Sequence, residues 1–119
     1  ISNNQVKQID MNTQENNKLI AKFMGYEVKH NKCYSPKYND GTIAPMQFHK
    51  SWDWLMPVVE KIESLVDEKG CAIYNVVIEQ CFVEIIENHT SDEIVNLDRD
   101  NKKDAIYDAV VEFIKQLNK

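Results

Sequence analysis

The stretch of residues 51–86 reads SWDWLMPVVEKIESLVDEKGCAIYNVVIEQCFVEII and contains the clearest structural signals in the chain. Its first half repeats apolar residues at steps of three and four, the spacing of one helix face; these residues are Trp52, Leu55, Val58, Val59, Ile62, Leu65 and Val66. Its second half also fits a buried helix, but its many β-branched and aromatic residues favour strands. We therefore expect a helix followed by paired strands.

The helix is expected over residues 51–68, with Ser51 as its N-cap and Gly70 ending it. Asp53 in the first turn complements the helix dipole. Pro57 has no N–H to donate and crowds the preceding turn. We therefore expect a kink at Pro57 or a helix start closer to it.

The strands are expected over residues 73–79 and 81–87, or as one long bent strand. A turn at 88–92 and a further strand at 93–98 follow. The last helix is expected from residue 102 to the end. Its apolar residues form one continuous stripe: Ile106, Ala109, Val110, Phe113, Ile114 and Leu117. Asp100 or Asn101 is expected to cap it.

Before residue 51 the signals are weaker. Residues 1–11 are polar without a sustained period and are expected to form a flexible arm. A first helix is expected over 13–24, since Asn12 and Glu15 have capping-box spacing and Gly25 suits the position after a helix end. A short extended segment at 26–30 and a long irregular loop at 31–48 complete this half. Such a long loop is usually functional or mobile.

These elements predict an α+β fold with a single domain at residues 12–119. A length of 119 residues suits one domain. Amphipathic helices must cover a sheet or one another. The expected architecture is a small, mostly antiparallel sheet packed with about three helices.

Four segments carry a resemblance to a known family. The sequence NNKLIAKFMG at 16–25 resembles the opening of the phage ABA-sandwich domain family, with its "IA…MG" segment. The sequence VVEKI at 58–62 is similar to that family's "VVEKL"-like helix end, and 105–117 is similar to its C-terminal helix. The run WDWLMP at 52–57 looks like a version found in phage and prophage proteins of gut bacteria.

This resemblance covers about residues 12–117. It implies an α/β/α-type sandwich and an origin in a mobile element, and it supplies no activity or catalytic residues. The chain departs from the family pattern at Pro57 and in a longer polar stretch over 88–101. These departures concern the edges of the sheet rather than its core.

Composition excludes several classes of function. Hydrophobic residues make up 43% and charged residues 28%, an ordinary globular balance. The net charge of -5 argues against a nucleic-acid partner. No apolar run approaches the roughly 20 residues that span a bilayer, so no membrane partner is expected. Three cysteines without a basic-then-apolar leader suggest reduced thiols in a bacterial cytoplasm.

The charge is unevenly distributed. Residues 1–50 carry a net charge of +3 and residues 51–119 a net charge of -8. Six acids and one base, Arg99, lie between Glu84 and Asp100. This stretch suggests an acidic face exposed to solvent. A more specific hypothesis is that it forms a docking surface for a basic partner or a cation.

Catalytic and metal signals are weak. His30, Cys33 and His49 could supply zinc ligands or a thiol nucleophile with a base, but no second ligand pair or third catalytic group accompanies them. Glycines at 25, 41 and 70 alone cannot form a phosphate-cradling loop. Glu84 and Glu87 would point to opposite faces of a strand. We therefore expect no enzyme, cofactor or metal.

Aromatic residues supply the candidate binding site. Trp52 and Trp54 would point about 200° apart on a helix, so one packs inside and the other stands at the rim of the 31–48 loop. An exposed aromatic rim suits ligand stacking or a partner interface. The candidate binding residues are Tyr34, Tyr38, Phe48, His49, Trp52 and Trp54. The alternative is that these aromatics only cover the edges of the core.

The resulting hypothesis is a non-enzymatic binding or accessory protein of phage or prophage origin. It would bind an unknown protein partner through the 31–48 loop and the start of the second helix. The alternative is a protein that binds or sequesters a nucleotide-like small molecule. Four lysines would then offer charge to its phosphates: Lys29, Lys32, Lys37 and Lys50. Neither the sheet order nor the oligomeric state follows from the sequence.

Overall fold

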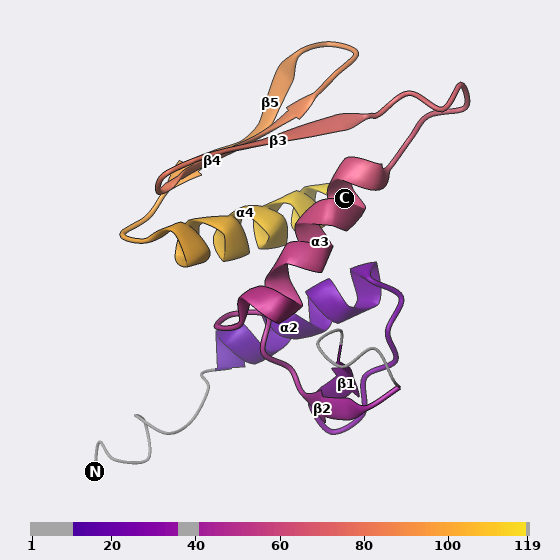
Figure 1. Cartoon of the computed structure of the whole chain (residues 1–119), viewed down its shortest axis with the longest axis vertical. Coiled ribbons are helices and arrows are strands. Elements are labelled where there is room, and N and C mark those ends of the chain that lie inside the picture. The colour runs from indigo at the N-terminus through magenta and orange to yellow at the C-terminus, as the bar shows by residue number, and fades with distance from the viewer. Residues whose placement is uncertain (1–10, 36–40, 119) are drawn as a thin grey trace.

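The computed structural model describes residues 11–35 and 41–118. These ranges contain three helices and two antiparallel sheets, which confirms the α+β class (Figure 1). The helices are α2 (Met11–Phe23), α3 (Trp52–Ser64) and α4 (Lys102–Leu117). The strands are β1 (Lys32–Tyr34), β2 (Ile43–Pro45), β3 (Tyr74–Glu79), β4 (Phe82–Glu87) and β5 (Asp92–Asp98).

The larger sheet has the order β3-β4-β5, with both neighbouring pairs antiparallel. Of the two alternatives that the sequence left open, two strands or one long bent strand, the structure has two strands. Glu79 pairs with Phe82, so a two-residue turn joins β3 to β4, and Gln80 in it has a φ of 52°. In β5 the register slips by one residue at Ile94, whose carbonyl accepts a 2.8 Å hydrogen bond from Gln116 of α4.

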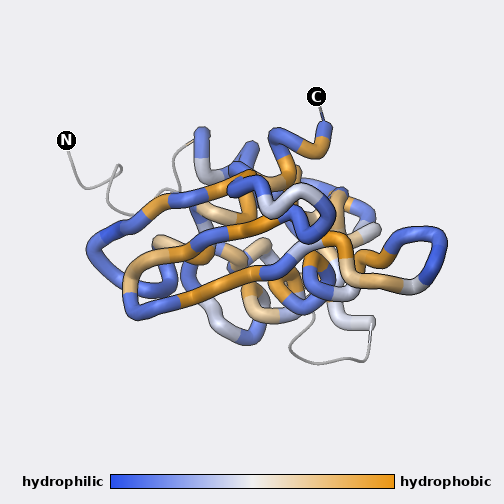
Figure 2. The backbone as a smooth tube through the Cα atoms, turned by 90° about the horizontal axis from the view of Figure 1, so that it is seen from above, coloured by the Kyte–Doolittle hydropathy of each residue, from blue (hydrophilic) through white to orange (hydrophobic). Residues whose placement is uncertain are grey.

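Only one face of this sheet is covered. Alternate residues of its strands pack into the core; they are Tyr74, Val76, Ile78, Val83, Ile85, Val95 and Leu97. Helices α3 and α4 lie on this side, and α2 and the β1-β2 hairpin lie beyond them (Figure 1). Figure 2 looks onto the other face, over which no described element lies. An α/β/α sandwich would need helices on both faces, so the described chain departs from the expected layering.

Helix α4 is the centre of the core. Eight of its residues are buried: Ala105, Ile106, Tyr107, Ala109, Val110, Val111, Phe113 and Ile114. The sheet packs against one side of α4, and α2 and α3 pack against other parts of its surface. Asn101 is the N-cap, and its side chain accepts a 2.9 Å hydrogen bond from the Asp104 N–H. One of the two expected caps is thus confirmed, and the predicted stripe is buried from Ile106 to Ile114, whereas its last residue, Leu117, is exposed.

Helix α3 is shorter than predicted. It ends at Ser64 rather than at residue 68, and Val66 forms a bridge with Ala72. The Asp67 side chain accepts hydrogen bonds from the N–H groups of Lys69 and Cys71, which holds a turn instead of a further helical turn. Gly70 therefore belongs to this turn and does not cap the helix.

The start of α3 also differs in part from the prediction. The helix begins at Trp52, so Pro57 lies inside it and does not mark its start. Ser51 occupies the cap position with extended backbone, but its side chain makes no capping hydrogen bond. A proline removes one hydrogen bond from the ladder, so this helix relies on the packing of its buried face.

The first half of the chain contains the predicted helix and two features that the sequence did not predict. Residues 29–32 form a tight turn, so the predicted extended segment at 26–30 does not include His30, which with Asn31 has a positive φ, at 53° and 62°. The predicted loop at 31–48 holds the β1-β2 hairpin. Helix α2 ends as expected, because Gly25 at φ 83° allows the Tyr26 N–H to reach the Ala21 carbonyl at 2.9 Å. Of the predicted arm, Met11 is helical and residues 1–10 lie outside the described ranges.

Replacing Phe113 by alanine tests the position of α4 in the core. Its ring contacts those of Phe23 and Tyr74, with centroids 6.1 and 4.8 Å away, so Phe113→Ala should lower the free energy of unfolding by about 3–5 kcal/mol. Urea denaturation followed by circular dichroism measures the change. Leu117→Ala is the matched control on the same helix, because Leu117 is exposed. A loss below about 1 kcal/mol for Phe113→Ala would place the wrong face of α4 in the core.

Candidate functional site

The two tryptophans divide as the helical spacing predicts. Trp54 is buried and meets the ring of Phe48 edge to face at 5.1 Å between centroids. Trp52 is 42% exposed. Phe48 is itself fully buried, so Phe48 and Trp54 belong to the hydrophobic core and offer no surface to a ligand.

Two of the other predicted site residues, Tyr34 and His49, have ring contacts with different neighbours. Tyr34 packs on the ring of Tyr26 at 5.2 Å, where burial raises the pKa of the Tyr26 hydroxyl above its usual range. Tyr38 lies outside the described residues. His49 faces α4 instead, with its ring 6.3 Å from that of Tyr107. Tyr34 and His49 thus contact different parts of the fold.

His49 belongs to a polar network that the sequence analysis missed. The Asn17 amide lies 3.0 Å from His49 Nδ1, and the Tyr107 hydroxyl donates to Asn17 Oδ1 at 2.9 Å. Asn17 is only 1% exposed, so these hydrogen bonds satisfy a polar group inside the core. The sequence did contain a signal for this network, because Asn17 lies three positions before Ile20 and therefore on the apolar face of α2. The network joins α2 and α4 to the turn before α3.

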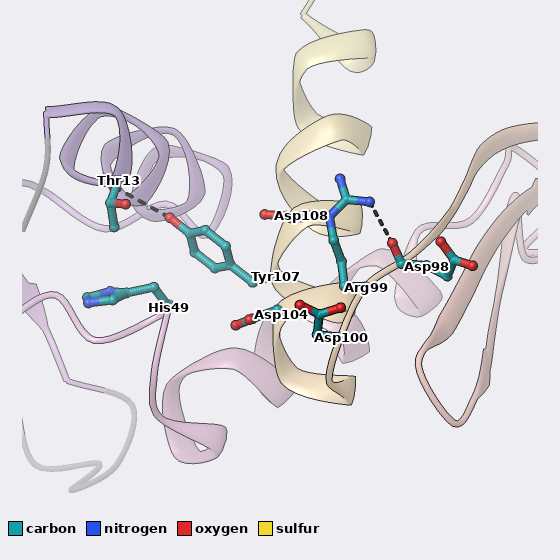
Figure 3. A pocket seen from close by; sticks show the side chains of 8 residues that line it. All are labelled: Thr13, His49, Asp98, Arg99, Asp100, Asp104, Tyr107 and Asp108. Carbon is teal, nitrogen blue, oxygen red and sulfur yellow. Dashed lines mark hydrogen bonds and ion pairs between the residues drawn. The ribbon is translucent and has the colours of Figure 1, made fainter.

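A cleft of about 660 Å³ opens beside this network (Figure 3). It is lined by Thr13, His49, Tyr107 and Arg99, together with four acids: Asp98, Asp100, Asp104 and Asp108. Arg99 does not offset them all, because its Nε already lies 2.7 Å from Asp108 Oδ2. A cleft with this excess of carboxylates repels phosphate groups.

The thiol at the predicted reactive position is unsuited to nucleophilic attack. Cys33 is buried on β1, and burial raises the pKa of its thiol to about 11. The thiolate is the attacking species, and little of it forms at neutral pH with such a pKa. Among residues 11–35 and 41–118, no three His, Cys, Asp or Glu side chains are placed to hold a metal ion.

His89 links the turn after α3 to the β4-β5 hairpin. Its Nε2 lies 3.1 Å from Asp67 Oδ2, and its Nδ1 lies 3.7 Å from Glu87 Oε2. The backbone N–H of Cys71, followed by that of Lys69 and by His89, lowers the pKa of the Asp67 carboxyl. The backbone N–H of Thr90 likewise lowers the pKa of Glu87. These contacts hold the edge of the sheet against the end of α3.

The uncovered side of the larger sheet is the remaining candidate surface, here termed the open sheet face. The alternation of the strands and their register place nine side chains on it: Asn75, Val77, Glu79, Phe82, Glu84, Ile86, Glu93, Asn96 and Asp98. Three of the nine are apolar and half-buried, and four are acidic. Glu87 lies on the opposite face from Glu84, as predicted, so these two carboxylates share no site.

Comparison with known proteins found no matching family model, curated protein or solved structure. The similarity to the phage ABA-sandwich family therefore rests on the quoted motifs alone. Within the part of the chain that the structure describes, no helix is long and apolar enough to cross a membrane.

The lowered carboxyl pKa values predict an acid-sensitive contact. A carboxyl whose pKa is lower in the folded than in the unfolded state stabilises the fold above its ordinary pKa, and this stabilisation is lost as the pH falls below about 4. Asp67→Asn should therefore reduce the difference in unfolding free energy between pH 7 and pH 3, measured by urea denaturation. Glu60→Gln, an exposed carboxylate of α3, is the control. An unchanged pH dependence in Asp67→Asn would refute a role for this turn.

The tryptophan pair predicts two unequal effects on stability. Trp54→Ala removes a buried side chain and should cost about 3–5 kcal/mol of unfolding free energy. Trp52→Ala removes an exposed one and should cost less than about 1 kcal/mol. Differential scanning calorimetry of both variants checks the contrast. Equal losses would mean that Trp52 also supports the core.

Proposed function

We propose that this chain is a non-enzymatic accessory protein of phage or prophage origin that binds a protein partner. The observation that carries the proposal is the open sheet face. Contiguous apolar side chains that a fold leaves uncovered are typical of interaction surfaces. On this face Val77, Phe82 and Ile86 are neighbours in the strand register and half-buried, and no described helix lies over the face (Figure 2). Three cysteines that form no disulfide support a reducing compartment such as the bacterial cytoplasm.

The surface predicted from the sequence, the 31–48 loop with the start of α3, remains a second candidate for partner contact. Among its described residues, Trp52 and Ile43 are large, apolar and exposed, at 42% and 62% exposure. The open sheet face has more support, because its apolar residues lie on adjacent paired strands and form one patch. The two surfaces lie at opposite ends of the molecule, so variants can separate them (Figure 1).

The alternative, a nucleotide-like ligand held between aromatics, has less support. Stacking needs an exposed ring, and both Phe48 and Trp54 are buried. The cleft beside His49 is lined by four aspartates and would repel phosphates. Native mass spectrometry of gently purified protein tests this alternative directly, since a retained mass of nucleotide size would favour it over a protein partner.

Quantitative affinity purification from cells of the source organism tests the proposal. The bait variants are Phe82→Ser and Glu84→Lys on the open sheet face, Trp52→Ala on the second surface, and Glu60→Lys as the exposed control. If a partner binds through the sheet face, its recovered amount should fall at least about tenfold with both face variants. With the other two variants, the recovered amount should stay within about twofold of that obtained with the unchanged chain. Circular dichroism establishes that each variant is folded.

Two outcomes would contradict the sheet-face assignment. Loss of the partner with Trp52→Ala alone would place the contact on the 31–48 loop and the start of α3. Equal recovery of every protein by all four variants would mean that none of the captured proteins binds a specific surface of this chain.

A further inference from the structure

The register of the larger sheet arranges the open sheet face in three rows across the strands. Phe82, Glu84 and Ile86 alternate along the central strand β4. Each row takes one residue from β3, β4 and β5 in turn: Glu79, Phe82 and Asp98; Val77, Glu84 and Asn96; and Asn75, Ile86 and Glu93. The apolar side chains therefore flank Glu84 on three sides, and acids occupy three of the four ends of the outer rows.

The carboxylates of this face are not neutralised within the described chain. No Lys, Arg or His of residues 11–35 and 41–118 forms an ion pair with Glu79, Glu84 or Glu93. Glu93 accepts one hydrogen bond, from the Asn96 amide at 3.2 Å. Carboxylate oxygens without cationic partners attract a surface that presents Lys or Arg.

The same charges exclude other occupants. A second copy of this chain would bring two sets of like-charged carboxylates together, which is unfavourable. A nucleic acid would bring phosphates against the carboxylates. A partner that is basic and partly apolar would complement both the acids and the half-buried side chains of Val77, Phe82 and Ile86.

The dimensions of the face suit a single helix. Three strands spaced about 4.8 Å apart give a width of about 10 Å, close to the diameter of an α-helix with its side chains. Strands of six or seven residues extend about 20 Å, the length of about 14 helical residues. An amphipathic helix of about four turns would therefore cover the face.

We propose that the open sheet face binds a basic amphipathic helix of the protein partner. The apolar side of the helix lies on Val77, Phe82 and Ile86, and flanking Lys or Arg residues pair with Glu84 and the acids at the row ends. This inference rests on the proposed function and names the chemistry of its partner. Such a footprint is smaller than a standard interface, so we expect an affinity of about 10–100 μM for the isolated helix.

A synthetic peptide of about 15 residues, with leucines on one helical face and lysines flanking them, is the probe. Two-dimensional amide NMR locates its contact on the chain, and fluorescence anisotropy measures its affinity at low and high salt. We expect shifts confined to β3, β4 and β5 and weaker binding at high salt. A matched peptide with every lysine replaced by glutamate should not bind.

Variants separate this face from general attraction to an acidic protein. Glu84→Lys should lower the affinity for the lysine peptide at least tenfold. Phe82→Ser should also lower this affinity, although it leaves the charge of the face unchanged. Glu60→Lys adds the same charge on the exposed side of α3 and should change the affinity less than twofold. Equal losses in Glu84→Lys and Glu60→Lys would overturn the proposal, as would shifts centred on the cleft beside His49.

Failure of this inference differs from failure of the proposed function. If the lysine peptide does not bind while a cellular partner still depends on Phe82 and Glu84, the face binds a partner of another chemistry. If the peptide binds the face while no cellular partner depends on it, the proposed function is wrong even though the face has the inferred preference.

Discussion

Helix α4 imposes the constraint on which the rest of the structure depends. Eight of its 16 residues are buried, so its apolar surface is too wide for one neighbour to cover. The sheet takes one side, and α2 and α3 take the rest. Because every described helix is used in surrounding α4 or in packing beside it, none remains for the other side of the sheet. The open sheet face is thus a consequence of how α4 is buried.

The polar network of Asn17, His49 and Tyr107 adds specificity to this packing. Apolar contacts tolerate sliding, whereas a buried amide requires its partners in defined positions. Asn17 can meet both the His49 ring and the Tyr107 hydroxyl only when α2 has one register along α4. The network also explains why His49, an apparent site residue, has a structural role on the side facing the core.

The sequence predicted those elements whose pattern repeats. The stripe of α4 extends over enough residues to identify both the helix and its buried face, and the many β-branched and aromatic residues between 73 and 87 identify the strands. The end of α3 was missed because a side-chain oxygen of Asp67 decides it, and such local hydrogen bonds leave no period. The β1-β2 hairpin was missed because strands of three residues are too short to show alternation.

The candidate site was predicted less well, for a related reason. Aromatic residues were selected by type, and the type of a residue does not distinguish a core contact from an exposed rim. Helical geometry did separate Trp52 from Trp54, but nothing local indicated that Phe48 would meet Trp54 inside the core. Conversely, Val77, Phe82 and Ile86 were assigned to strands without their outward direction being used. Their significance depends on where the helices lie, which is a tertiary property.

The acidic charge of the second half of the chain acquires meaning from this arrangement. Residues 51–119 carry a net charge of -8, and they form both the sheet and α4. Their carboxylates are distributed over the open sheet face and the cleft beside His49, so the field on this side of the molecule favours approach by any basic partner. Such a field accelerates encounter but discriminates poorly between basic surfaces. The apolar side chains occur on the sheet face, so discrimination between partners depends on how well a partner covers Val77, Phe82 and Ile86.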